Sequence, residues 1–179
     1  MKTILFNHRA KKHLKTHPRK RRFVNYEKSK SILLLFESDE KGDEQIKNIV
    51  QTLKNDRKDV VTLGFSTAKV LVESDLPEIK LFNKKNTDFF QKPEKAIFSE
   101  LTTAKFDLLI DLSVHRLIPL MYISLLCDAS MKISTKINDT QLFDFILNVE
   151  KQSGEKNALN EQNLFDEIIF YLKSIQTSD

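Results

Sequence analysis

Residues 31–38 read SILLLFES, and this short stretch decides the fold class. Its five consecutive apolar side chains, Ile32 to Phe36, have polar residues on both sides, which is typical of a strand buried on both faces. Four apolar residues then recur at the spacing of one helix face: Ile46, Ile49, Val50 and Leu53. A second β-branched run, DVVTLGF, follows at 59–65. A strand, a helix and a strand within about 34 residues predict a right-handed βαβ unit.

The same alternation continues towards the C-terminus. Further strands are predicted at 79–82, 106–112, 131–134 and 143–147, and helices at 93–103 and 117–127. A closing helix carries one apolar stripe: Leu164, Ile168, Leu172 and Ile175. The stretch 70–72 fits either an edge strand or a loop, and 152–160 is typical of a polar loop. The sequence therefore predicts an α/β fold, a single three-layer Rossmann-like or flavodoxin-like domain with a mostly parallel sheet.

Charge divides the chain into two parts. Residues 1–30 contain eleven of the 29 Lys and Arg side chains and one of the 25 Asp and Glu, which leaves 18 basic and 24 acidic side chains for residues 31–179. We therefore divide the chain into a basic N-terminal arm, residues 1–30, and an α/β domain, residues 31–179. A basic arm on an acidic body indicates a polyanionic partner.

The arm is predicted to have a helical part and an extended part. Phe6, Ala10 and Leu14 are spaced at i, i+4 and i+8, so a helix is expected over 3–16, and Pro18 is expected to end it. Eight cations lie within the stretch RAKKHLKTHPRKRR. We predict that they bind the phosphates of a nucleic acid: Arg9, Lys11, Lys12, Lys15, Arg19, Lys20, Arg21 and Arg22.

Four interpretations of this arm compete. In the first and favoured one it binds RNA, ribosomal RNA in particular, and stacks bases on Phe6, Phe23 or Tyr26. In the second it is an amphipathic helix on an anionic membrane surface, with inserted side chains from Ile4, Leu5, Phe6 and Leu14. In the third it docks on a protein partner or on the acidic surface of its own domain. In the fourth it is a disordered, solubilising tail.

A second candidate site follows the strand at 106–112. In parallel α/β sheets, ligands bind beyond the carboxyl ends of the strands. Asp111, Ser113 and His115 alternate at this end and Arg116 precedes the next helix, so the four side chains predict an anion or small-ligand site. A structural use of the same residues, with Ser113 capping the helix, explains the pattern at least as well.

Several other kinds of site find no support in the sequence. Cys127 is the single cysteine, and the patterns GxGxxG and GxxxxGK[ST] are both absent, so no disulfide, cysteine zinc cluster or cofactor is predicted. His8, His13 and His17 do not all share a helix face and lie among cations, so no metal site is predicted. No apolar stretch reaches the ~20 residues that span a bilayer, and the apolar run in MKTILF is too short for a secretory signal. A cytoplasmic location is therefore expected.

Three stretches carry a resemblance to a known family: KKHLK at 11–15, FDLLI at 106–110 and LFDEIIFYLKSI at 164–175. They make the chain similar to a family of small uncharacterised bacterial proteins, a domain of unknown function. The resemblance implies a basic N-terminal helix joined to a Rossmann-like domain, and it implies no activity or catalytic residues. We therefore expect a non-enzymatic RNA-binding protein. A ligand-binding or enzymatic domain and a peripheral membrane protein are the alternatives.

Overall fold

The computed structural model describes residues 1–38, 44–71, 74–135, 142–147 and 160–174. Its core is a six-stranded sheet in which all neighbouring strands run parallel, in the order β3-β2-β1-β4-β5-β6. The strands are β1 (Ser31–Ser38), β2 (Asp59–Ser66), β3 (Ile79–Asn83), β4 (Lys105–Asp111), β5 (Asp128–Ser134) and β6 (Phe145–Ile146). This is the strand order of Rossmann-like sheets, so the predicted fold class is confirmed.

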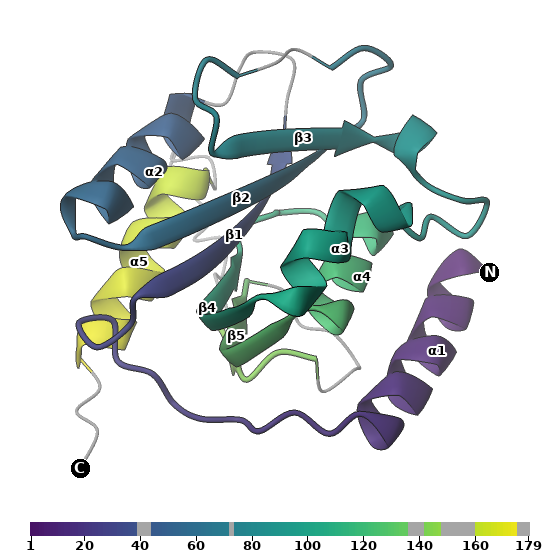
Figure 1. Ribbon diagram of the computed structural model, residues 1–179, viewed down its shortest axis with the longest axis horizontal. Coiled ribbons are helices and arrows are strands. Elements are labelled where there is room, and N and C mark those ends of the chain that lie inside the picture. Colours follow the sequence, from purple (N-terminus) through teal and green to yellow (C-terminus); the bar gives the residue numbers. More distant parts are fainter. Residues whose placement is uncertain (39–43, 72–73, 136–141, 148–159, 175–179) are drawn as a thin grey trace, which may run out of the picture.

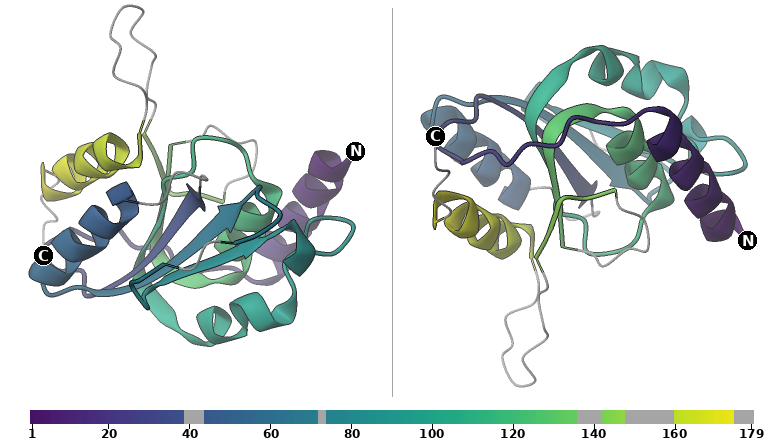
Figure 2. Two further views of the ribbon diagram at one scale, coloured as in Figure 1. Left: turned by 90° about the horizontal axis from the view of Figure 1, so that it is seen from above. Right: turned by 90° about the horizontal axis from the view of Figure 1, so that it is seen from below.

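Helices cover both faces of the sheet (Figures 1 and 2). One face is covered by α2 (Glu44–Asn55) and α5 (Glu161–Ser174), and the other by α3 (Lys95–Thr103) and α4 (Ile118–Leu126). A short 3-10 helix, η1 (Lys84–Asn86), follows β3. The N-terminal helix α1 (Lys2–Thr16) packs against α4, and its bounds agree with the helix predicted from the apolar seam.

The central strand β1 explains why two helical layers are needed. Its five apolar side chains are completely buried: Ile32, Leu34 and Phe36 face α2 and α5, whereas Leu33 and Leu35 face the α3 and α4 side. Gly64 of β2 pairs with Phe36, and a Cβ at this position would lie 2.7 Å from Cδ2 of Leu81 and closer still to the Phe36 ring. Glycine in β2 therefore makes room for the aromatic ring of the neighbouring strand.

The arm is part of the domain core. Phe6 and Ala10 of α1 are buried, and the Phe6 ring meets the ring of Tyr122 edge-on, with 4.9 Å between centroids. Further along, Val24 and Tyr26 are buried in the cluster on the α2 and α5 side. The docking of the arm on its own domain is therefore correct. The contact of α1 is apolar, and the extended segment after it pairs with the carboxylate of Asp144. The disordered-tail interpretation is wrong for this part of the chain.

Some local predictions need correction. α3 begins at Lys95, two residues after the predicted start at Pro93. Phe6 and Tyr26 are buried, so neither ring is accessible to a base. Residues 70–71 belong to no strand, and only Phe145–Ile146 of the predicted strand at 143–147 pair with the sheet. Ile175 and residues 152–159 lie outside the described residues.

A lysine lies inside the core between β5 and α4. Lys132 is 2% exposed, and its Nζ donates a 2.5 Å hydrogen bond to the backbone carbonyl oxygen of Ser124. Burial, followed by the nearby charge of Arg19, lowers the pKa of this ammonium to about 8. Its ordinary value is 10.5, so keeping the charged form in the folded protein at pH 7 costs about 3 kcal/mol.

Replacing Lys132 by Met is expected to stabilise the fold at pH 7 by about 1–3 kcal/mol, because it removes the buried charge. Above pH 8 the unfolded chain binds this proton more tightly than the folded protein does, so the stability of the parent rises towards pH 10.5 and the gap to the variant closes. Urea unfolding of both proteins at about pH 7 and pH 9.5 measures the gap. The exposed control Lys95→Met changes stability by less than ~0.5 kcal/mol at either pH. A gap that does not depend on pH would contradict the buried charge.

Replacing Phe6 by Ala is expected to lower the free energy of unfolding by about 3–5 kcal/mol, because it empties the contact between α1 and Tyr122. The matched control is Ile4→Ala, on the outward side of the same helix, where an exposed side chain contributes little. Urea unfolding of the three proteins measures the difference. Equal stability of the two variants would show that α1 is no part of the core.

Candidate nucleic-acid interface and strand-end site

The outward face of α1 carries lysines. At 100° per residue, Lys11, Lys12 and Lys15 lie about 140°, 240° and 180° around the helix from the buried Phe6. All three side chains are exposed. Residues 1–26 contain nine Lys and Arg and no Asp or Glu. Because Phe6 and Ala10 fix the inward face, these lysines project from a helix whose orientation is set by the fold.

The extended segment after α1 continues this basic surface. α1 ends at Thr16, two residues before Pro18, as predicted. The N–H of Arg22 donates a 3.0 Å hydrogen bond to the carbonyl oxygen of Ser130, which holds the segment against β5. Lys20, Arg21 and Arg22 are exposed, and Nε of Arg21 lies 3.4 Å from a carboxylate oxygen of Asp144. We define the exposed basic surface as the side chains of Lys11, Lys12, Lys15, Lys20, Arg21 and Arg22.

Two of the eight predicted phosphate-binding residues are held by partners inside the molecule, and a third, Arg21, is exposed but pairs with Asp144. The guanidinium of Arg19 is 9% exposed, donates to the carbonyl oxygens of Ala129 and Ser130, and lies 2.5 and 2.7 Å from the two carboxylate oxygens of Asp144. Nη1 of Arg9 donates a 3.2 Å hydrogen bond to the hydroxyl of Tyr122. Sequence alone gives no sign of this difference, since all eight cations stand in one acid-free stretch.

His13 of α1 adds little charge to this surface near neutral pH. His13 and His17 stack with 4.5 Å between ring centroids. Burial lowers the pKa of His13, and the charges of His17 and Lys132 lower it further. His13 therefore stays neutral to a lower pH than an ordinary histidine, and the lysines and arginines carry the charge of the surface.

The four residues at the end of β4 bond to different partners. The buried Asp111 accepts hydrogen bonds at one carboxylate oxygen from the N–H and the hydroxyl of Ser113. Nδ1 of the exposed His115 lies 2.8 Å from the carboxylate of Glu37 on β1, and Arg116 donates to the side-chain oxygen of Asn7 on α1. The position lies between β1 and β4, where the direction of the crossovers changes and where ligands bind in such sheets. The side chains here diverge towards three separate partners.

Ser113 does not cap the following helix. The residue before α4 is Leu117, which makes no side-chain cap hydrogen bond, and Pro119 stands in the first turn. Asp111 and Ser113 instead form a local turn that ends β4. Asp111 and Ser113 therefore have a structural role, but this role is a turn and not the helix cap that the sequence predicted.

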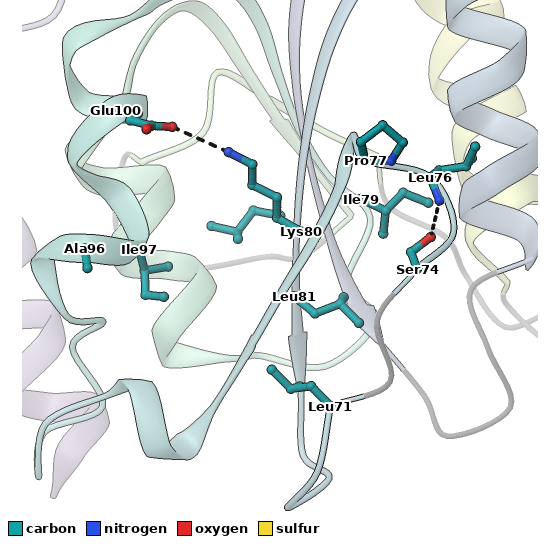
Figure 3. A pocket seen from close by; sticks show the side chains of 11 residues that line it. Leu71, Ser74, Leu76, Pro77, Ile79, Lys80, Leu81, Ala96, Ile97 and Glu100 are labelled. Carbon is teal, nitrogen blue, oxygen red and sulfur yellow. Dashed lines mark hydrogen bonds and ion pairs between the residues drawn. The ribbon is translucent and has the colours of Figure 1, made fainter.

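A pocket of about 550 Å³ lies beside the edge strand β3 (Figure 3). It forms where the described residues between β2 and β3 contain no helix, and it is lined by the loop between these strands and by α3. Leu71, Leu81 and Ile97 line it, and Lys80 and Glu100 form an ion pair across 3.4 Å. It contains none of the four strand-end residues and no unpaired charge. The pocket thus offers a mixed polar and apolar surface away from both predicted sites.

The sequence analysis missed an exposed aromatic pair. Phe89 and Phe90 lie in the loop between η1 and α3, next to the N-terminal half of α1 (Figure 1). Lys2 lies over the first ring and Arg9 over the second. The signal in the sequence is the pair FF inside the polar stretch NTDFFQKP, which fits no strand or helix pattern.

Replacing Arg19 by Gln is expected to destabilise the protein by about 2 kcal/mol, because it removes the charge-assisted hydrogen bonds to Asp144 and to the carbonyl oxygens of Ala129 and Ser130. Its neighbour Lys20 is exposed, so Lys20→Gln is the control and changes stability by less than ~0.5 kcal/mol. Thermal or urea unfolding measures both. A loss of the same size in the two variants would mean that Arg19 has no special structural role.

Comparison with known proteins supplies a family but no activity. No helix in the described parts of the chain is both long and apolar enough to cross a membrane. In the same parts, no three His, Cys, Asp or Glu side chains gather as ligands for a metal ion. The chain matches no curated protein and no solved structure. Residues 2–175, from the start of α1 to just beyond α5, match the model of DUF6913, a family of unknown function, and the chain belongs to this family.

Proposed function

We propose that the protein binds RNA through the exposed basic surface of α1 and the segment that follows it. The observation that carries the proposal is the absence of any carboxylate from residues 1–26, combined with the fixed, outward position of Lys11, Lys12 and Lys15. Lysine and arginine side chains neutralise phosphates and release bound counterions, which gives affinity without reading the base sequence.

The packing of α1 supports this function over a flexible tail. A cation on an ordered helix loses less conformational freedom on binding than one on a disordered tail. The outward lysines are held by the burial of Phe6 and Ala10 on the opposite side of the helix. The rest of the chain carries more acidic than basic side chains, so it repels a polyanion and favours binding at the arm alone.

The membrane interpretation of the arm has less support. Of the four apolar side chains proposed to insert, Phe6 is buried in the domain, Leu5 and Leu14 are half-buried, and only Ile4 is exposed. A membrane-surface helix needs a continuous apolar face towards the lipid. The apolar face of α1 is directed towards α4 instead.

The decisive test replaces Lys11, Lys12 and Lys15 by Gln and measures binding to a labelled single-stranded RNA at several salt concentrations. For the parent, about 4–6 phosphate contacts give a slope of log K against log salt of roughly −3 to −5. The variant is expected to lose about 2 units of this slope, because about three contacts disappear. The matched control replaces Lys69, Lys95 and Lys105, three exposed lysines outside the arm, and has the same net charge. Binding that does not depend on salt, or an equal loss in the control, would contradict the proposal.

Substitution is a better test than truncation. A chain that starts at Ser31 lacks Val24 and Tyr26, both buried in the core, and would lose stability together with the arm. The charge variants leave every buried side chain in place. The same variants, sedimented through a gradient with ribosomal particles, test whether the RNA is ribosomal. Binding to ribosomal RNA would place the protein in the cytoplasm, as the sequence leads us to expect.

A further inference from the structure

Phe89 and Phe90 form an exposed aromatic tip beside the N-terminal half of α1. Phe89 is 70% exposed and Phe90 is 36% exposed, and the two rings are nearly perpendicular, with centroids 5.3 Å apart. Figures 1 and 2 show their loop next to the N-terminal end of α1. Exposing two large aromatic side chains to water is unfavourable, and such a pair marks a binding surface.

The loop holds the two rings in place. One carboxylate oxygen of Asp88 accepts the N–H groups of Phe90 and Lys92, at 2.8 and 2.9 Å. The N–H of Asp88 donates to the carbonyl oxygen of Lys92 at 2.9 Å, and Gln91 takes the left-handed conformation, with φ of 64°, that closes the turn. A tip fixed in this way presents its rings without a large loss of conformational freedom on binding.

Two cations connect the aromatic tip to α1. Nζ of Lys2 lies 5.0 Å from the centroid of the Phe89 ring, and Cζ of Arg9 lies 4.9 Å from that of Phe90. These are cation–π distances. The aromatic rings and the positive charges are therefore neighbours on one rigid part of the molecule. A nucleotide needs such an arrangement, because only one sugar separates its base from its phosphate.

We propose that Phe89 and Phe90 stack on unpaired bases of an RNA strand whose phosphates contact α1. This inference rests on the proposed function and adds a preference for single-stranded over double-stranded RNA. Only unpaired bases expose the faces on which an aromatic ring stacks, and such stacking tolerates any sequence. Arg9, which lies inside the molecule, is then a positioning residue for Phe90.

A lipid bilayer fits the same surface less well. Insertion of Phe89 into hydrocarbon would take with it the ammonium of Lys2, which lies over the ring, and a charge in hydrocarbon is costly. A phosphate next to a stacked base uses both groups at once. The exposed Phe170 on α5, at the opposite face of the sheet, is 66% exposed and has no cation over its ring among the described residues. It serves as the control position.

The experiment compares a single strand with a duplex of the same RNA, using binding of a fluorescent label at constant salt. Changing both Phe89 and Phe90 to Leu keeps apolar area but removes the aromatic faces. We expect this variant to bind the single strand about 10–100-fold more weakly, with an unchanged salt slope, and to bind the duplex within about twofold of the parent. Changing both to Tyr retains binding, and Phe170→Leu has no effect. Melting temperatures confirm that the variants, all at exposed positions, are folded.

The outcomes separate the two proposals. If the parent binds neither RNA, the proposed function is wrong and the stacking site is wrong with it. If the parent binds RNA and the double Leu variant binds the single strand equally well, the stacking site alone is wrong. Vesicles containing phosphatidylserine complete the test: flotation of the parent that survives the change to Leu, without RNA binding, would assign the rings to a membrane.

Discussion

The burial of β1 on both faces is the constraint on which the rest of this structure depends. A strand whose five central side chains are all apolar requires a neighbour at each edge and a helical layer on each face. The crossover helices α2, α3 and α4 supply most of these layers, while the described residues that lead into β3 and β6 contain no helix. The outer strands are therefore covered by other segments. A loop covers β3, beside which the pocket lies, and α1 extends the layer next to α4.

This constraint gives the arm two roles at once. The same helix that carries outward lysines completes the core through Phe6 and Ala10, so its charge is presented at a fixed place and not on a tail. The eight cations that look alike in the sequence then divide by position. Arg9 and Arg19 attach the arm to the domain, and the exposed Arg21 shares the carboxylate of Asp144. The other side chains of the exposed basic surface point away from the core. Which cations of such an arm are available to a partner can therefore be decided only from the packing of the arm on its domain.

Periodicity predicted the elements well because burial dictates it. The runs at 31–38, 59–65 and 106–112 and the apolar seam of α1 each appear as the expected strand or helix. The strand-end site was harder to predict, since spacing placed Asp111, Ser113, His115 and Arg116 on one edge but said nothing of their partners. Glu37 and Asn7, far away in the sequence, decide where two of these side chains point. The aromatic tip was missed because periodicity analysis ignores residues between elements.

The path of the arm depends on Asp144 more than on hydrophobic packing alone. This carboxylate receives the guanidinium of Arg19 and the N–H of Lys132, beside a buried ammonium that destabilises the fold. An apolar cluster at this position would give more stability. An ion pair is more specific: Asp144 pairs with the arm only where the arm places a guanidinium next to it, and this fixes the distance along the chain between α1 and Arg19. The pairing of Arg19 with Asp144 therefore fixes the register of the arm against β5, and that register sets the direction in which the basic surface faces.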